Sequence, residues 1–138
     1  MTRILGVTII VLALAISIIP SFTDCASQGG ALTLASGKEI PMKCHWTAKA
    51  EIAVGVPLMA VGAVTVVNRR KQALMALGIV GGLLGLFAIL LTTNGLIGVC
   101  TTPTMICRTV MKPAMTVLGS AAIAASLAII VIARRTTD

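Results

Sequence analysis

The chain has 138 residues, of which 57% are hydrophobic, 11% are charged and 2% are aromatic, with a net charge of +7. Soluble domains carry about 25% charged residues, so this composition excludes an ordinary water-facing globular domain. The basic residues stand at the ends of apolar runs, which is typical of membrane topology signals and argues against nucleic acid as a partner. The near absence of aromatic residues also argues against an outer-membrane barrel with aromatic girdles.

The apolar residues are gathered in runs that are long enough to cross a bilayer, which takes about 20 residues. Within their central parts the one ionisable side chain is Glu51. We therefore predict an all-α membrane protein whose single domain, residues 1–138, holds a 2+2 bundle of transmembrane helices. The expected helices are residues 4–22, 48–67, 73–93 and 114–133.

The first loop, residues 23–47, is the largest polar segment of the chain. Two short extended runs, Ala31–Ala35 and Lys38–Met42, flank the dipeptide Ser36-Gly37, a pattern that predicts a small β-hairpin. Pro41 is expected on its edge, because proline cannot donate a hydrogen bond to the ladder. A loop of this size cannot hold a hydrophobic core of its own, so we expect either a covalent link or the helix ends beneath it to stabilise it.

The third and fourth helices carry small residues at spacings that allow close approach of their backbones. Gly78 and Gly82, and likewise Gly81 and Gly85, are four residues apart, and Gly119–Ala122 offers a matching surface. We expect these helices to pack tightly within the molecule, with a dimer face as the alternative. The short segment Asn68–Gln72 before the third helix permits only an antiparallel pair of helices.

Orientation follows from the basic residues, which are densest beside the two termini and between the second and third helices. These residues are Arg3, Arg69, Arg70, Lys71, Arg134 and Arg135. By the positive-inside rule we expect a multi-pass protein of the plasma membrane with both termini in the cytoplasm. The outer loops, residues 23–47 and 94–113, would then be extracellular.

The cysteines fall two in each outer loop, which predicts disulfides in an oxidising exterior. The simplest pairing joins Cys25 to Cys44 and Cys100 to Cys107, each within its own loop. A link between the loops, for example Cys44 to Cys107, is the alternative. The chain lacks the Cys-x-x-Cys pair of thiol oxidoreductases, which argues against catalytic redox chemistry.

A soft-metal site is a second interpretation of the same loops. Thioether, thiolate and imidazole groups suit a soft ion such as Cu(I). The candidate ligands are Met42, Cys44, His45, Met105, Cys107 and Met111. Disulfide-bonded cysteines cannot be ligands, however, and methionine commonly fills irregular contacts between helix ends and a loop. We therefore expect no cofactor and keep copper as the alternative.

Glu51 lies near one end of the second apolar run, at about headgroup depth. A charge inside a membrane segment is a functional candidate by default. At this shallow position we expect a structural ion pair with Lys112 or Arg108, which would tie the two halves of the chain together. No second buried carboxylate or histidine is available to build a proton relay.

The chain resembles a prokaryotic family of small four-helix membrane proteins catalogued as domain of unknown function 4418. The resemblance rests on the segment Pro41–Thr47, on Glu51 after it, and on Cys25, Cys100 and Cys107. It covers nearly the whole chain, and Met-Lys-Cys-His at residues 42–45 is its most specific part. It implies the topology and the importance of these residues, and no reaction.

The sequence therefore favours a protein that is not an enzyme. It contains no nucleophile with a base and an orienting group, no acid pair and no phosphate-binding loop. We expect an integral membrane subunit or scaffold whose disulfide-stapled extracellular cap binds a membrane-protein partner or mediates assembly into a homo-oligomer. The bilayer itself is the other expected partner, and soft-metal handling is the alternative function.

Overall fold

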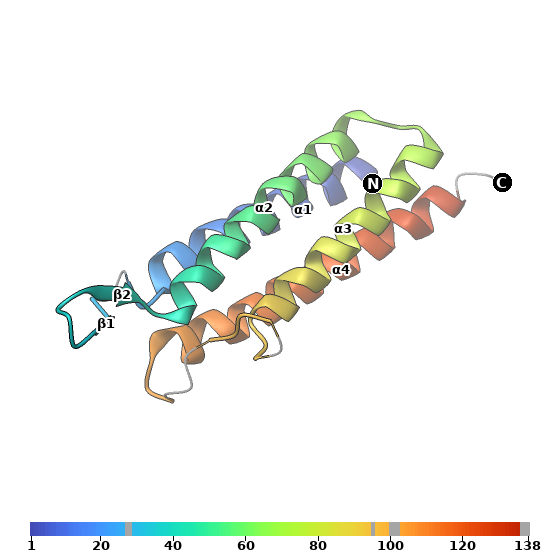
Figure 1. Ribbon diagram of the computed structural model, residues 1–138. Coiled ribbons are helices and arrows are strands. Elements are labelled where there is room, and N and C mark those ends of the chain that lie inside the picture. The colour runs from blue at the N-terminus through green and yellow to red at the C-terminus, as the bar shows by residue number, and fades with distance from the viewer. Residues whose placement is uncertain (27–28, 95, 100–102, 136–138) are drawn as a thin grey trace.

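The computed structural model describes residues 1–26, 29–94, 96–99 and 103–135. The long helices are α1 (Thr2–Thr23), α2 (Lys43–Val67), α3 (Lys71–Leu91) and α4 (Lys112–Arg135) (Figure 1). A hairpin of β1 (Ala31–Thr33) and β2 (Glu39–Pro41) lies between α1 and α2, and a π-helical turn, η1 (Cys107–Met111), leads directly into α4.

Among the described residues, four helices are long and apolar enough to cross a membrane, as the sequence predicts: α1, α2, α3, and η1 continued by α4. A bilayer core has no water to satisfy backbone N–H and C=O groups, and a helix satisfies them internally. Side chains on the outside of the bundle are accordingly apolar and exposed, among them Val7, Leu83 and Leu127.

Two helices begin well before the expected residue, which changes the setting of two cysteines. α2 begins at Lys43 instead of residue 48, and the last helix begins with η1 at Cys107 instead of residue 114. Cys44 and Cys107 therefore lie in the first turns of helices, and the expectation that they lie in loops was wrong. The apolar run marks the part of a helix that crosses the membrane, and a polar first turn leaves no such signal.

The π-helical spacing of η1 has a local cause in Pro113, the second residue of α4. The backbone N–H of Lys112 donates to the carbonyl of Cys107, five residues back. A proline ring inside an α-helix clashes with the carbonyl four residues earlier, and the wider turn relieves that crowding. As a result the helix continues through Pro113 with Cys107 turned toward the bundle, where it is fully buried.

The helices pack as two pairs, α1 with α2 and α3 with α4, which confirms the predicted 2+2 bundle. Glycines allow the close approach within each pair. A Cβ added at Gly55 would lie 3.1 Å from the carbonyl oxygen of Ala13, and one at Gly85 would lie 2.9 Å from that of Gly119. The predicted tight packing of the third and fourth helices within the molecule is confirmed.

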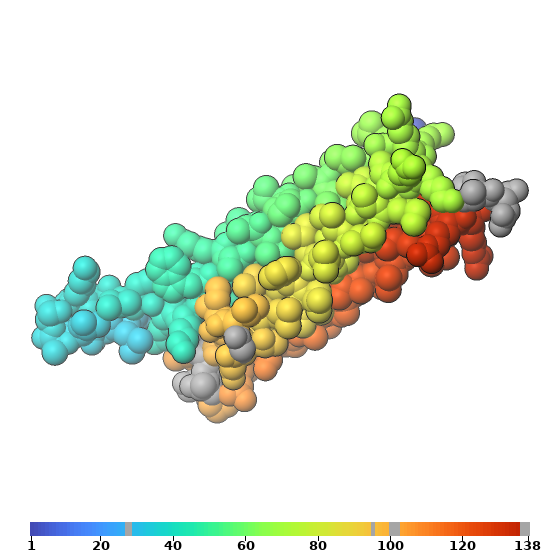
Figure 2. Space-filling view, turned by 45° about the vertical axis from the view of Figure 1, so that its right-hand side comes forward, coloured from blue at the N-terminus to red at the C-terminus, as the bar shows by residue number. Residues whose placement is uncertain are grey.

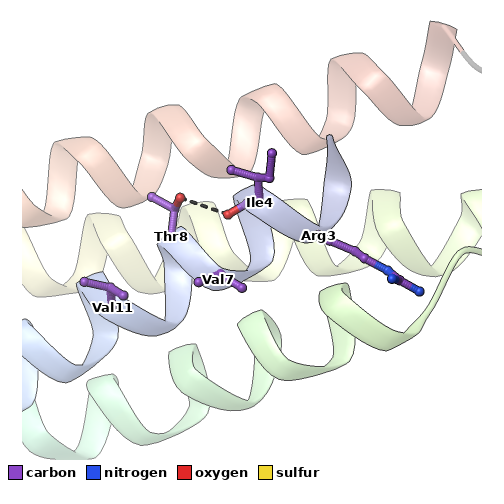
Figure 3. A pocket seen from close by; sticks show the side chains of 5 residues that line it. All are labelled: Arg3, Ile4, Val7, Thr8 and Val11. Carbon is purple, nitrogen blue, oxygen red and sulfur yellow. Dashed lines mark hydrogen bonds between the residues drawn. The ribbon is translucent and has the colours of Figure 1, made fainter.

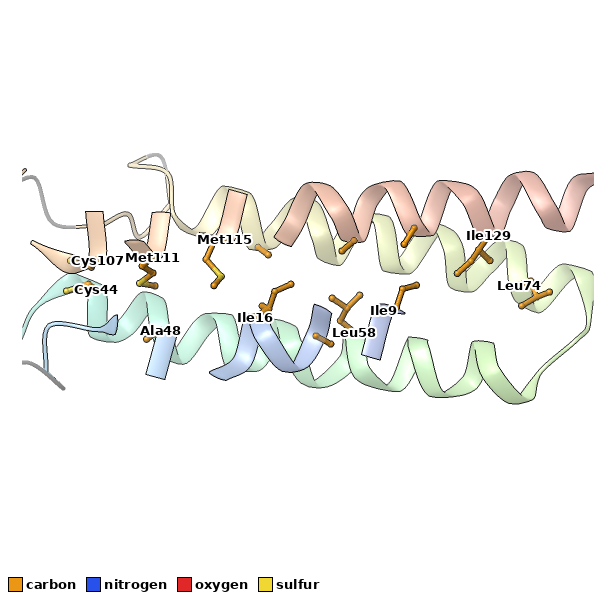
Figure 4. Packing of buried hydrophobic residues seen from close by; sticks show 14 of the residues in the cluster. Ile9, Ile16, Cys44, Ala48, Leu58, Leu74, Cys107, Met111, Met115 and Ile129 are labelled. Carbon is orange, nitrogen blue, oxygen red and sulfur yellow. The ribbon is translucent and has the colours of Figure 1, made fainter. Parts of the chain in front are cut away.

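The core runs along the bundle between the two helix pairs (Figure 4). Ile9 and Ile16 of α1 and Leu58 of α2 face Met115 and Ile129 of α4, and all five side chains are fully buried. The outer face of α1 carries a shallow hollow lined by Arg3, Ile4, Val7, Thr8 and Val11 (Figure 3). Its one hydroxyl, on Thr8, donates to the carbonyl of Ile4 at 2.9 Å, so the hollow offers lipid chains an apolar surface.

The predicted hairpin is present. Its antiparallel register pairs Ala31 with Pro41, Leu32 with Ile40 and Thr33 with Glu39. In the turn, the N–H of Gly37 donates to the carbonyl of Leu34 at 2.8 Å, and Gly37 adopts a φ of +78°, a conformation that glycine takes without a steric penalty. Figure 2 shows this hairpin, in cyan, standing clear of the end of the bundle.

The two ends of the bundle differ in what they carry (Figure 1). One end, here called the terminal end, holds the beginning of α1, the end of α4 and the turn between α2 and α3. The other, here called the cysteine end, holds the hairpin and η1. Both cysteine-bearing segments therefore lie at the same end of the molecule.

Candidate functional site

The cysteine end is stapled by a disulfide between Cys25 and Cys44, which confirms that predicted pair. Cys25 follows the end of α1 and Cys44 lies in the first turn of α2, so the bond closes the segment that contains the hairpin. Because Cys44 bonds to Cys25, the alternative link between Cys44 and Cys107 does not form. The predicted Cys100–Cys107 pair involves Cys100, which lies outside the described residues.

A third cysteine lies against this disulfide. The Sγ atom of Cys107 is 3.3 Å from Sγ of Cys25, and the Sγ atoms of Cys25, Cys44 and Cys107 all lie within 4.8 Å of one another. The thioether sulfur of Met105 is 4.0 Å from Sγ of Cys25. We call Cys25, Cys44, Met105 and Cys107 the sulfur cluster. It joins the two halves of the chain, which the sequence separates by about 80 residues.

The sulfur cluster continues into the core along one face of η1 and α4. Cys107, Met111 and Met115 are spaced four residues apart and all three are fully buried (Figure 4). From outside, a hollow of about 280 Å³ reaches the cluster between Gly30, Thr104 and Ile106, with Cys25 and Met105 in its lining. The cluster is therefore largely enclosed but has one open side.

His45 takes part in a different contact. Its Nδ1–H donates to Oδ2 of Asp24 at 2.9 Å, because an ionised carboxylate can only accept. The side chain of Asp24 is 9% exposed and that of His45 is 26% exposed. Asp24 was not a candidate residue, since nothing in the sequence pairs two side chains 21 residues apart before the chain is folded.

The structure thus divides the predicted soft-metal ligands. Cys44, Met105 and Cys107 come together and Cys25 joins them, whereas His45 is held by Asp24. Met111 lies one turn deeper on η1, and Met42 is partly buried against the core. Within the part of the chain that the structure describes, the sulfur cluster is the one group of candidate metal ligands.

Thr47 is a second residue that the sequence did not single out. Its hydroxyl donates to the carbonyl of Gly98 at 2.7 Å, across 51 positions of the chain. Thr47 is fully buried on the same side of α2 as Cys44. This bond fastens the start of α2 to the segment after α3 and so connects the two helix pairs beside the sulfur cluster.

The expected ion pair of Glu51 is not present. Glu51 is fully buried, and neither carboxyl oxygen has a hydrogen-bond partner in the described structure. Lys112 and Arg108 both have exposed side chains. The predicted ion pair rested on the depth of Glu51 in the membrane, which the sequence places near headgroup level. The direction of its side chain decides otherwise, because the fold turns it into the bundle with Cys44, Thr47 and Ala48.

These features define the chain as a four-helix membrane-like protein with one end closed by a disulfide. Residues 4–132 match the family described as "Domain of unknown function (DUF4418)", and the chain belongs to it. The resemblance drawn from the sequence is therefore confirmed. No curated protein and no solved structure matches the chain.

Proposed function

We propose that this protein is a non-enzymatic membrane subunit that presents its β1–β2 hairpin to a partner membrane protein. The observation that carries the proposal is the exposure of the hairpin, whose six paired residues are all exposed. Leu32 and Ile40 lie opposite each other and stay 57% and 40% exposed. A contiguous patch of exposed apolar side chains outside a core marks an interaction surface.

The two edges of the hairpin are not equivalent. Because the N–H of Leu34 donates to the carbonyl of Lys38 at 3.0 Å, the alternation of an antiparallel ladder turns the backbone groups of Thr33 and Pro41 outward. Proline has no N–H to offer, so Pro41 blunts the edge of β2. The edge of β1 keeps its donors and acceptors, which favours a partner segment that adds there as a third strand.

The Cys25–Cys44 disulfide supports this role by holding the hairpin to the ends of α1 and α2. A surface that is ordered before binding loses less conformational entropy when the partner arrives. Disulfides persist in oxidising compartments, and Arg69, Arg70 and Lys71 gather at the other end of the bundle. The proposal therefore places the cysteine end outside the plasma membrane and both termini in the cytoplasm.

The occupant of this edge is proposed to be a segment of another protein and not a second copy of the chain. Two copies inserted in the same membrane share one orientation, and the hairpin extends from the end of the bundle (Figure 2). Their β1 strands would then meet in parallel, which is the less stable pairing per residue. A partner segment is free to run antiparallel to β1.

Two proline substitutions, one on each strand of the hairpin, test whether the partner binds the edge of β1. Thr33→Pro removes the outward N–H of β1, whereas Glu39→Pro makes the same change at the opposing position of β2. We expect a discrete membrane protein to co-purify in mild detergent with the wild type and with Glu39→Pro, and to be lost with Thr33→Pro. Isolation of the wild-type chain as a lone monomer would contradict its role as a subunit. Cross-linking of the chain into a dimer would show that the edge of β1 binds a second copy of the chain and not another protein.

Soft-metal binding is a second candidate, favoured by the packing of the sulfur cluster. In a tetrahedral thiolate site with metal–sulfur bonds of about 2.3 Å, the sulfur atoms are about 3.8 Å apart. Three Sγ atoms within 4.8 Å of one another are therefore close to that arrangement once the protein is reduced, and Met105 adds a thioether. Thiolates and thioethers are soft ligands that suit Cu(I), and thiolates also bind zinc and Fe–S clusters.

Copper binding is tested by titrating Cu(I) under anaerobic conditions into fully reduced and into oxidised protein, against a competing chelator. The candidate function predicts one tightly bound ion in the reduced form only. Met105→Leu should weaken binding, and Met59→Leu, at a partly buried methionine of α2 outside the cluster, should not. Equal binding by the oxidised and reduced forms would contradict it.

A further inference from the structure

Glu51 is an acidic side chain in the interior of the bundle. It is 0% exposed, and both of its carboxyl oxygens lack a hydrogen-bond partner among the residues that the structure describes. Glu51 is the ninth residue of α2, so at a rise of 1.5 Å per residue it lies about 12 Å along the helix from Lys43. This position is within a segment that is apolar enough to span a membrane.

Most of the buried residues beside Glu51 on α2 and at its level in the bundle are apolar. Glu51 lies one turn beyond Ala48 and about two turns before Leu58, a level at which Met115 of α4 and Ile16 of α1 face the interior (Figure 4). A group in such a place normally has a partner, because burying an unpaired polar atom costs free energy. The absence of a protein partner in the described structure is thus an observation that points to a ligand.

No charged group in the described structure neutralises a carboxylate at this position. Asp24, at the end of α1, is bonded to His45, and α3 carries its one charged residue at its first position, at the terminal end. The remaining charged groups near the cysteine end have exposed side chains: Lys38 and Glu39 of the hairpin, Lys43 and Lys49 on α2, Arg108 on η1 and Lys112 on α4. The described salt bridges include none with Glu51.

We propose that Glu51 is a proton-binding site in the membrane-spanning part of the bundle, and that its carboxyl group carries the proton in the resting protein. An ionised carboxylate here would be a buried charge without a counter-ion, which proteins avoid by neutralising the group. A metal cation would need several oxygen ligands. The hydroxyl of Thr47, four residues before Glu51 on α2, donates its hydrogen to the carbonyl of Gly98 and so is not a donor to the carboxyl group.

This inference is independent of the hairpin and of the sulfur cluster. It concerns a different part of α2 and a different ligand, so it stands whether or not a partner binds β1. It also separates Glu51 from the other acidic residues that the structure describes, because Glu39 is exposed on β2 and Asp24 is paired. Of these groups, Glu51 alone combines full burial with an apolar setting, so an apolar reagent specific for protonated carboxyl groups should react with it.

The test uses N,N′-dicyclohexylcarbodiimide, an apolar reagent that attacks protonated carboxyl groups inside membranes. The carboxyl proton moves to a nitrogen of the reagent while a carboxyl oxygen bonds to its central carbon, and an acyl shift to nitrogen gives a stable N-acylurea. The whole mass of the reagent is retained on the side chain. We expect one such adduct on Glu51 of the full chain in detergent at neutral pH, found by mass spectrometry of its peptides.

Two variants accompany the wild type. Glu51→Gln keeps the size of the side chain without a proton to transfer and should abolish the adduct, whereas Glu39→Gln should leave it unchanged. Labelling should fall as the pH is raised, because only the protonated form reacts. Full labelling of Glu39 with none on Glu51 would overturn the proposal, and so would loss of labelling when sodium or potassium is added at constant pH, since that would identify a bound cation.

An infrared measurement on unlabelled protein covers the case in which Glu51→Gln does not fold. A protonated carboxyl gives a carbonyl stretch distinct from the two bands of a carboxylate, and it should be present at neutral pH in the wild type. Where the variant folds, that band should be missing. The midpoint of thermal unfolding of Glu51→Gln should lie close to that of the wild type, because a neutral amide replaces a neutral acid. A spectrum with carboxylate bands alone would overturn the proposal.

Discussion

Sγ of Cys107 lies 3.3 Å from Sγ of Cys25, although the two residues are 82 positions apart and Cys25 is already bonded to Cys44. This contact brings the first cysteine-bearing segment against the second at one end of the bundle. Three sulfur atoms this close make more than one pairing geometrically accessible, because a disulfide then needs only a small adjustment of side chains whose sulfur atoms already lie together.

The first prediction concerns this alternative pairing. The variant Cys44→Ser, expressed into an oxidising compartment, should form a Cys25–Cys107 disulfide. Among the described cysteines other than Cys44, Cys107 is the one whose Sγ contacts Sγ of Cys25. Peptide mapping without reduction would detect the linked pair, and the wild type should show Cys25 linked to Cys44. Recovery of Cys25 from the variant as an alkylated thiol would show that the contact does not support a bond.

A second prediction concerns the stability that the staple supplies. The Cys25–Cys44 bond closes a loop with a sequence separation of 19 residues. In the chain-entropy account, a loop of this size stabilises the folded state by about 3 kcal/mol. The double variant Cys25→Ser/Cys44→Ser should lose about that much in equilibrium unfolding in detergent. A loss below about 0.5 kcal/mol would mean that the helix ends hold the hairpin without the bond.

Glycine packing between α3 and α4 gives a third prediction with a control on the same helix. A Cβ at Gly85 would lie 2.9 Å from the backbone oxygen of Gly119, whereas one at Gly82 would meet nothing closer than Cβ of Ser126 at 3.8 Å. Both Ala variants gain similar helix propensity. Gly85→Ala should therefore be less stable than Gly82→Ala by about 1–3 kcal/mol in thermal or chemical unfolding. Equal stability of the two would contradict the close approach of these helices.

The hydrogen bond from Thr47 to Gly98 gives a fourth prediction. Thr47→Val keeps the shape of the side chain but leaves the carbonyl of Gly98 without this donor, so the variant should lose about 1–2 kcal/mol of unfolding free energy. Thr47→Ser keeps the hydroxyl and should lose less. A valine variant as stable as the serine variant would show that the bond does not fasten the two helix pairs.

Much of the local structure follows from the sequence. The apolar runs predict the helices because the bilayer requires about 20 apolar residues for each crossing. The hairpin follows from two extended runs around Ser36-Gly37, and the glycine spacing predicts the approach of α3 to α4. Each of these signals lies within one segment or between neighbours in the chain.

The sequence pattern was least informative at the polar beginnings of helices. Hydropathy does not mark the first turns of α2 and of the helix that begins with η1, so the sequence pattern predicts that Cys44 and Cys107 lie in loops. The sequence pattern also misleads at Glu51. It predicts an ion pair with Lys112 or Arg108 because all three residues lie at a similar distance from the membrane surface. Distance along the membrane normal does not say which way a side chain points around the helix.

By itself, then, the sequence determined the membrane class, the helices and the hairpin, and it favoured the pairing of Cys25 with Cys44 that the structure confirms, because hydropathy, turn chemistry and short separations act locally. Only the tertiary structure decided that Cys107 meets that disulfide, that Asp24 holds His45 and that Glu51 is enclosed without a partner in the described structure. These outcomes depend on the rotation of each helix about its axis, which is settled when the two pairs pack against each other and which no single segment encodes.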